Sequence, residues 1–471
     1  MISCTFVERV IFGKISFMLL RIVVENFMSY KERQEFTMFP NRGIVELPSH
    51  IFDKETIPLL KMAALYGNNA SGKSNFTQAL SFIRAFALSE NPIRQETVAK
   101  HLYRLDQPEK IRESFLSILV EFKSEETYFI YKVEIGLKGV RLEQLLLSDP
   151  KGTPKELYTR TGNHIELSDS LSSKSRDQWA HTSDILEKRL EQDPFKSLLS
   201  LFVEFPVLDE KYIEQAYTWF RQCLVVTTGK TSHNELNALL YKVPLLSEFT
   251  SQVIEGVDIG VDKIRLKETE LATWLNQHSD LANTLDMNRR VEGSEIHSVV
   301  SHSDRPILNR INIDGKEKIL ELVFSHQGGD GGLYELDIEC ESDGTVRTLH
   351  LIPALFEAIN RFGIIVIDEI DTSLHSGLLL DLLAFFSLNS SKGQLVFTLH
   401  DTSILDSIGI LRSDEVWFVE KRAGSSHLYS LDNYTTEMDG DIARKYREGR
   451  FGSSYIGNLT RHSDAVRSIV L

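Results

Sequence analysis

The chain has 471 residues, of which 42% are hydrophobic, and a formal net charge of −15 at neutral pH. This length suits roughly two to four domains with a large apolar core, and no run of about 18 apolar residues exists to span a membrane. Its three cysteines are too widely spaced for a metal motif or a disulfide framework. We therefore expect a soluble, cytoplasmic protein. The acidic balance excludes a broadly basic nucleic-acid surface and leaves a local basic patch open.

The first 17 residues precede the first predicted strand. They do not form a signal peptide, because Glu8, Arg9 and Lys14 interrupt any apolar core. Residues 18–27 predict a strand and residues 33–39 a second one. We expect residues 1–17 to be dispensable or poorly ordered, with Met18 as the true start.

A phosphate-binding loop follows, with the pattern G-x-x-x-x-G-K-S. Residues 59–66 before it can form a buried strand, and the apolar residues after it fall on one helical face. This strand–loop–helix context argues against a chance glycine-rich turn. Backbone N–H groups and the helix N-terminus would bind phosphates. Lys73 would reach the β- and γ-phosphates, and the Ser74 hydroxyl would ligate Mg²⁺. The loop residues are Gly67, Asn68, Asn69, Ala70, Ser71, Gly72, Lys73 and Ser74.

The next segments predict a β lobe and then a helical one. Residues 115–122, 128–135 and 140–147 alternate as strands, and short turns between strands favour an antiparallel meander. From residue 168 the sequence becomes polar and helix-prone, with a break near Pro244. We interpret it as an inserted helical lobe, since no heptad pattern is sustained for a coiled-coil arm.

Two strand ends in the second half carry polar residues suited to nucleotide hydrolysis. Residues 363–369 form an apolar run that ends in Asp368 and Glu369, and such a run suits a central parallel strand with ligands at its carboxyl end. Asp368 would hold Mg²⁺, and Glu369 would orient and deprotonate the attacking water. His400 ends the strand at 394–401 and could sense a γ-phosphate, although a histidine there could equally be a polar cap.

A second anion site is predicted where residues 341–345 precede a helix that runs to about residue 360. Ser342 and Gly344 at a helix start resemble the first site but lack a lysine. We therefore expect them to contact a nucleotide whose charge is neutralised by another subunit.

Together, these motifs resemble the head of an ABC-type ATPase of the SMC-like branch. The resemblance is strongest to compact AAA-superfamily ATPases of bacterial defence loci, namely the RloA-like proteins and the ATPase subunits of the Septu and PARIS anti-phage systems. It covers most of residues 18–452. Relatives often have Arg at Thr372 and Pro at Ser376, which bears on dimer contacts and not on ATP binding. The narrower likeness is carried by residues 341–345, 367–375, 400–406, 412–421 and 446–452.

The resemblance implies an α/β fold: a P-loop ABC-type ATPase head with an antiparallel β lobe and an inserted helical lobe. We assign residues 1–17 to an extension, 18–167 and 301–471 to the two parts of the head, and 168–300 to the inserted lobe. ATP and Mg²⁺ are the expected cofactors.

The resemblance also implies a function. The chain would form a homodimer or higher homo-oligomer around ATP and control a separately encoded effector, a nuclease or toxin, without a membrane partner. The alternatives are a DNA-repair ATPase that acts directly on DNA and, with least support, a nuclease within this chain, since no further acidic cluster has a metal-site context.

Overall fold

The computed structural model describes residues 17–52, 57–90, 92–148, 153–168, 173–205, 211–228, 235–278, 297–300, 306–360, 363–390, 393–406, 409–434 and 442–451. The predicted extension therefore lies outside the described residues, except for Phe17. The chain divides into two compact units. We call the one built from residues 19–221 and 396–471 the P-loop unit, and the one built from residues 222–395 the α12 unit. In the described parts, no helix combines the length and apolar character needed to cross a membrane.

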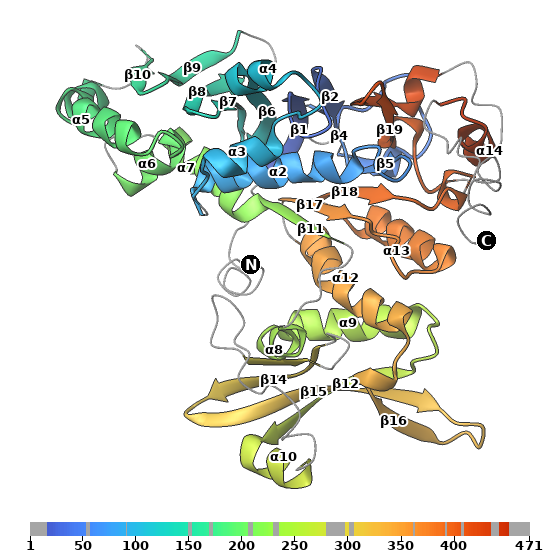
Figure 1. Cartoon of the computed structure of the whole chain (residues 1–471). Helices are drawn as coiled ribbons and strands as arrows, with labels where there is room; N and C mark the ends of the chain where they lie inside the picture. Colours follow the sequence, from blue (N-terminus) through green and yellow to red (C-terminus); the bar gives the residue numbers. More distant parts are fainter. Residues whose placement is uncertain are drawn as a thin grey trace, which may run out of the picture. The chain divides into compact units, whose positions relative to one another are not determined.

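A seven-stranded sheet dominates the P-loop unit, in the order β10-β9-β8-β7-β6-β1-β2 (Figure 1). The five strands β6 to β10 pair antiparallel in sequence order, which confirms the predicted meander. β6 and β7 are joined by a two-residue turn in which Glu125 has a φ of 58°. The strands are β1 (Phe17–Glu25), β2 (Gln34–Thr37), β6 (Phe115–Ser124), β7 (Thr127–Gly136), β8 (Gly139–Ser148), β9 (Lys155–Thr161) and β10 (His164–Leu167).

A second group of strands in the P-loop unit carries the phosphate-binding loop. The fully buried β5 (Met62–Tyr66) leads into the loop, and α2 (Lys73–Leu88) leaves it. β5 pairs in parallel with β19 (Val416–Arg422), and β19 pairs antiparallel with β20 (Ser425–Ser430). On its other side, β5 neighbours β18 (Gly393–Leu399), which enters this unit at Val396. The short strands β3 (Ile51–Phe52) and β4 (Leu59–Leu60) form a separate hairpin.

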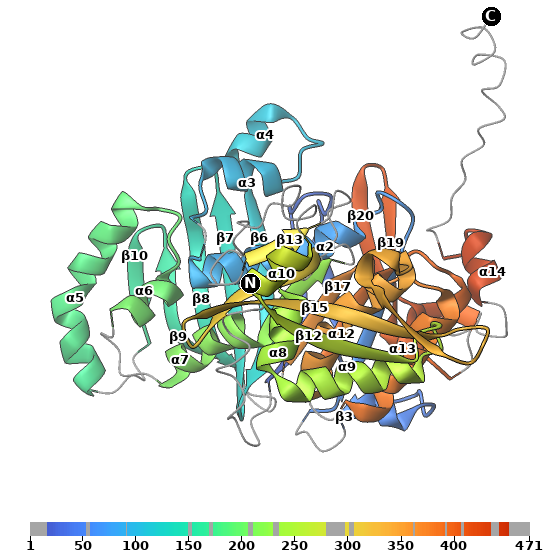
Figure 2. The same cartoon turned by 90° about the horizontal axis from the view of Figure 1, so that it is seen from below.

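Several helices cover the P-loop unit. α5 runs alongside β10 (Figure 2), and the Glu187 carboxylate on α5 accepts hydrogen bonds from the backbone N–H of Ile165 and from the His164 ring. α7 continues into a π-helical turn, Trp219–Cys223, whose Trp219 ring stacks on Phe122 of β6. The helices are α3 (Gln95–His101), α4 (Pro108–Glu113), α5 (Ser173–Gln192), α6 (Leu198–Glu204), α7 (Lys211–Thr218) and α14 (Ile442–Arg447).

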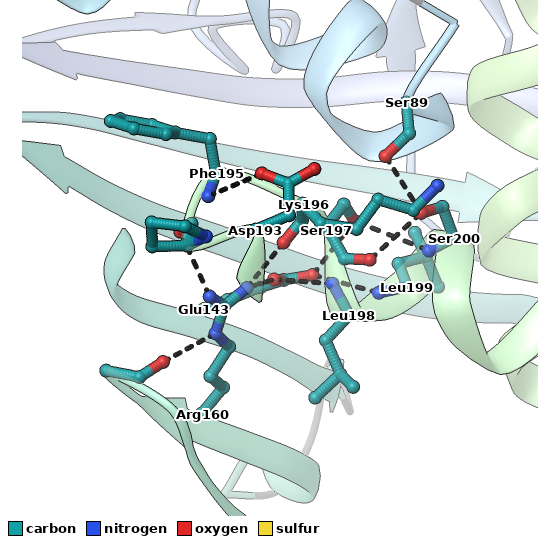
Figure 3. Close-up of polar contacts among 12 residues, drawn as sticks. Ser89, Glu143, Arg160, Asp193, Phe195, Lys196, Ser197, Leu198, Leu199 and Ser200 are labelled. Carbon is teal, nitrogen blue, oxygen red and sulfur yellow. Dashed lines mark hydrogen bonds and ion pairs between the residues drawn. The ribbon is translucent and has the colours of Figure 1, made fainter. Parts of the chain in front are cut away.

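A buried ion pair connects the meander with α6 (Figure 3). Helix α6 in turn packs against α2, the helix that follows the phosphate-binding loop. Glu143 of β8 and Arg160 of β9 are both fully buried, with the Arg160 Nη1 3.4 Å from the Glu143 Oε2. Glu143 also accepts hydrogen bonds from the backbone N–H groups of Leu198 and Leu199, at 2.8 and 3.0 Å. These are N–H groups of the first turn of α6, which have no partner within the helix and attract a carboxylate.

The α12 unit contains a pair of parallel strands and two long helices. β11 (Leu224–Thr228) pairs in parallel with β17 (Gly363–Asp368), which is buried throughout. α12 (Asp343–Asn360) packs against β17, α13 (Ser376–Asn389) and α9, and it is buried along almost its whole length. Pro353 lies inside α12.

A five-stranded antiparallel sheet completes this unit, with helices on both faces (Figure 1). α8 packs its Ala238 against Leu320, while α10 packs its Trp274 against Ile319, and neighbouring residues on a strand point to opposite faces. The strands are β12 (Lys263–Glu270), β13 (His297–Val300), β14 (Pro306–Ile313), β15 (Lys316–Gln327) and β16 (Leu333–Asp337). The helices are α8 (Leu236–Lys242), α9 (Pro244–Gly256) and α10 (Leu271–Gln277).

The predicted helical lobe at residues 168–300 needs correction, because β11, β12 and β13 lie within it beside its helices. β12 was missed because only one of its faces is buried and the other is polar, so its sequence lacks an apolar run. The two units divide at residues 221/222 and 395/396, which differs from the predicted boundaries. The break at Pro244 is confirmed, since α8 ends at Lys242 and α9 begins at this proline.

Candidate functional site: a phosphate-binding loop and an acidic strand end

The phosphate-binding loop forms the expected strand–loop–helix turn in the P-loop unit. β5 ends at Tyr66 and α2 begins at Lys73, with Gly72 as its N-cap. Ala70 and Gly72 have φ angles of 64° and 121°, so the backbone reverses direction within this turn. The free N–H groups at the start of a long helix, together with its dipole, favour an anion at this position.

Both glycines of the loop are required by close approaches. A Cβ atom at Gly67 would lie 2.5 Å from the backbone oxygen of Val419, and one at Gly72 would lie 2.8 Å from the Ser29 hydroxyl. Gly72 also has a positive φ, which L-residues with side chains rarely adopt. The packing of the loop against β19 and the turn after β1 therefore requires glycine at both positions.

Lys73 is held over the loop and not extended into solvent. Its side chain is buried, and its ammonium group donates to the backbone oxygens of Gly67, at 2.5 Å, and Asn68, at 3.3 Å. Nδ1 of His400, at the end of β18, lies 3.4 Å from the same ammonium group. The structure thus brings together two residues that the sequence assigned separately to phosphate binding.

A shell of hydroxyl groups supports the loop, and no sequence motif predicts it. The Ser426 hydroxyl of β20 donates to the Ser71 backbone oxygen and also lies 2.7 Å from the Ser29 hydroxyl, and Asn75 donates to Ser29 at 2.7 Å. The buried Tyr30 hydroxyl donates to the Gly72 oxygen at 3.0 Å, and burial raises the pKa of this tyrosine far above its usual range. Ser426 lies on β20, and Ser29 and Tyr30 lie in the turn after β1, so only tertiary structure places these three residues beside the loop.

The two predicted acids lie at the carboxyl end of β17 in the α12 unit. Asp368 is the last residue of the strand and is buried. Glu369 follows with a φ of 54° and is partly exposed, and its backbone oxygen accepts from the N–H of Thr372 at 3.2 Å. A non-glycine residue in this conformation is uncommon, and such residues cluster at functional sites.

Ser342 and Gly344 begin α12 as predicted. The Ser342 hydroxyl accepts a hydrogen bond from the Thr345 N–H at 3.1 Å and caps the helix. A Cβ atom at Gly344 would meet nothing closer than 3.4 Å, the distance to the backbone oxygen of Ser373. The packing of this chain therefore leaves room for a side chain at Gly344, unlike at the loop glycines.

The sequence matches one protein family over most of its length. A profile described as "AAA domain, putative AbiEii toxin, Type IV TA system" aligns with residues 62–224 and 232–406. The chain belongs to this AAA-domain family. The matched residues include the whole phosphate-binding loop, Ser342, Gly344, both acids and His400. No curated protein matches the sequence.

Solved structures with a similar chain trace include heads of SMC proteins. The SMC head bound to the C-winged helix domain of ScpA is 13% identical, with a TM-score of 0.41, and the match covers 88% of this chain and 97% of that one. The SMC head domain from Thermotoga maritima is 12% identical, with a TM-score of 0.39 and coverage of 88% and 98%. The Pyrococcus furiosus SMC head bound to the C-terminal domain of ScpA is 13% identical, with a TM-score of 0.41 and coverage of 92% and 100%.

The segment at 412–421 of this AAA-domain protein has a structural role. The buried Arg412 guanidinium forms two hydrogen bonds with the Asp414 carboxylate, at 2.9 and 2.8 Å, and donates to the backbone oxygens of Ile44 and Glu46. The adjacent Glu415 pairs with His50 at 3.0 Å. These contacts hold residues 44–50 against the start of β19.

Proposed function

We propose that this AAA-domain protein binds and hydrolyses ATP with Mg²⁺. The position of Lys73 is the observation that carries the proposal. Its ammonium group is held by the loop carbonyls beside His400, so a cation and a polar ring adjoin the N-terminus of α2. Three groups of donors suited to a γ-phosphate thus meet at one loop.

The residues of each unit have separate tasks in this proposal. The loop N–H groups and Lys73 bind the phosphates, and the Ser74 hydroxyl and the Asp368 carboxylate are oxygen ligands of the kind that Mg²⁺ prefers. Mg²⁺ supplies charge neutralisation on the transferred phosphoryl group. Glu369 orients a water molecule and accepts its proton. His400 donates a hydrogen bond to the γ-phosphate.

A pocket of about 320 Å³ beside the start of α2 supports the choice of a nucleotide over a simple phosphate. Asn75, which directly follows Ser74, lines this pocket together with Ser29. Met28 and Leu105 give it apolar surface, and Lys100 and Arg104 contribute positive charge. The pocket is thus suited to the nucleoside part of a nucleotide whose phosphates lie in the loop.

We further propose that two copies associate around ATP, with Ser342 and Gly344 of one copy facing the loop of the other. The room around Gly344 supports this assembly, because the packing of its own chain does not require a glycine there. A glycine in the first turn of a helix costs stability relative to alanine. Close approach of a second copy would explain why position 344 is a glycine.

The ATP-dependent state is proposed to control a separately encoded effector, a nuclease or toxin, in an anti-phage defence system of the RloA-like, Septu or PARIS kind. The description of the family as a toxin gives the competing proposal, in which this chain is itself the toxic component. In the described part of the chain, no group of three or more His, Cys, Asp or Glu residues is placed to hold a metal ion.

The experiment expresses the chain alone, with the protein encoded by its neighbouring gene, and as Lys73→Ala with the same neighbour. Toxicity that requires both proteins and is lost in Lys73→Ala supports the sensor proposal. Toxicity of the chain alone, with metal-dependent nucleic-acid cleavage that survives Lys73→Ala, contradicts it. Phosphate release from ATP by the purified chain tests the hydrolysis step separately.

A further inference from the structure

Arg347 is a buried cation near the start of α12, three residues after Gly344. Only 7% of the surface of this residue is exposed to solvent. The Nε and Nη2 atoms are fully covered and have no hydrogen-bond partner among the described residues. Arg160 and Arg412, the buried arginines of the P-loop unit, are by contrast paired with carboxylates and backbone oxygens.

Buried guanidinium nitrogens without hydrogen bonds are costly, because they have lost contact with water and have no protein acceptor in its place. Burial lowers the pKa of Arg347 to about 10, and the charge of Asp371 opposes this shift. The side chain is therefore a cation at neutral pH. A buried guanidinium cation is stabilised more by a carboxylate partner than an exposed arginine would be.

The turn that follows Glu369 lies against the first turn of α12 and carries Asp371. The Asp371 backbone oxygen accepts from the Leu374 N–H at 3.2 Å, and the Ser373 oxygen approaches Gly344. Glu369 and Ser373 both have positive φ angles, of 54° and 60°. Residues 369–374, which we call the acidic turn, therefore combine an unusual backbone with a carboxylate that acts electrostatically on Arg347.

We propose that Arg347 is a positioning residue whose guanidinium forms a bidentate pair with Asp371 when nucleotide is bound. The pair holds the acidic turn against the first turn of α12. Glu369 is thereby fixed relative to Ser342 and Gly344, and the two parts of the site respond to nucleotide together. This inference rests on the proposed ATPase function, and it concerns how Glu369 is positioned and not which group reacts.

The guanidinium geometry makes the pairing specific. Arginine presents two parallel N–H groups that match the two oxygens of a carboxylate, whereas a lysine ammonium is a point charge that cannot form both bonds. Lysine at position 347 should therefore restore charge without restoring full positioning.

The test compares Arg347→Met, Arg347→Lys, Asp371→Asn and the double variant Arg347→Met/Asp371→Asn in the full chain. Thermal unfolding is measured without nucleotide and with ATP, and kcat and KM are measured for ATP hydrolysis. Arg265→Met on β12 is the matched control, because it removes an exposed arginine that pairs with Glu335 in the same unit.

We expect Arg347→Met to unfold at the wild-type temperature or above it without nucleotide, since it removes unpaired buried donors. Its kcat should fall by about 10-fold or more with little change in KM, as for an interaction made after substrate binds. Asp371→Asn should lower kcat to a similar extent. The kcat of the double variant should be no lower than that of either single variant. Arg347→Lys should have a kcat between those of Arg347→Met and the wild type.

Loss of stability in Arg347→Met without nucleotide, at an unchanged kcat, would show a purely structural role and overturn the inference. Additive losses in the double variant would also overturn it, because they would mean that Arg347 and Asp371 act separately, for example with Arg347 binding a phosphate of a second copy. A wild-type chain that binds but does not hydrolyse ATP refutes the proposed function itself, and this result is visible before any variant is compared.

Discussion

The ammonium group of Lys73 lies 3.4 Å from Nδ1 of His400, although 327 residues separate the two along the chain. An ammonium group can only donate hydrogen bonds, so Nδ1 is the acceptor and the proton of a neutral ring is on Nε2. The contact thus holds the Nδ1 edge of the imidazole beside the loop. This arrangement suits a residue that detects a γ-phosphate.

Replacing Lys73 with alanine should weaken ATP binding by about 10-fold or more, because hydrogen bonds to charged groups contribute about 1.5–3 kcal/mol. Isothermal titration calorimetry with ATP measures the effect directly. Lys110→Ala, which removes an exposed lysine of α4, is the control and should bind normally. Equal affinity of Lys73→Ala and the wild type would refute the assignment of this lysine.

His400→Ala should slow hydrolysis more than it weakens ATP binding. The histidine lies at the edge of the loop, so its hydrogen bond is expected to matter most when the γ-phosphate is cleaved. Steady-state kinetics should show a reduced kcat with KM changed only a few-fold. A normal kcat would mean that His400 is only a polar cap at the end of β18.

Glu369→Gln should keep ATP binding and slow hydrolysis by about 10²-fold or more, the scale of a lost general base. Glutamine preserves the size of the side chain and removes its basicity. Single-turnover hydrolysis, together with a binding measurement on the same protein, separates the two effects. Hydrolysis at the wild-type rate would show that another group activates the water.

Mixing two inactive variants should restore activity if Ser342 and Gly344 complete the site of a second copy. Heterodimers of Lys73→Ala and Gly344→Asp chains would contain some composite sites with neither substitution. The ATPase rate of the mixture should then exceed that of each variant alone. No recovery in mixtures shown to contain heterodimers would indicate a site complete within one chain.

Glu143→Gln should destabilise the protein by about 3–5 kcal/mol, the usual cost of leaving a buried charge such as Arg160 unpaired. Chemical denaturation monitored by tryptophan fluorescence measures the change. Glu113→Gln at the end of α4 is the control, because this glutamate is exposed, and it should change stability by less than about 0.5 kcal/mol. Glu143→Met/Arg160→Met should recover part of the loss, since both charges are then absent. A stability unchanged in Glu143→Gln would contradict the role of the pair.

The sequence alone predicted the elements that depend on local patterns. The loop between β5 and α2, the antiparallel β6–β10, and the acids at the end of β17 all follow from glycine spacing or strand periodicity. The Lys73 and Glu369 roles also came from motif order, before any geometry was known. Short-range physics determines such features, because the backbone of a phosphate loop or a buried strand restricts the residues at adjacent positions.

Only the tertiary structure decided which distant residues meet. Ser426 supports the loop from β20 because β19 pairs with β5, and β12 is a strand because β15 lies beside it. Arg347 shows the same limit, since a polar residue in an amphipathic helix gives no sign that its guanidinium is buried without a hydrogen-bond partner in the described part of the chain. Long-range packing determines burial and pairing, and local sequence carries little information about either.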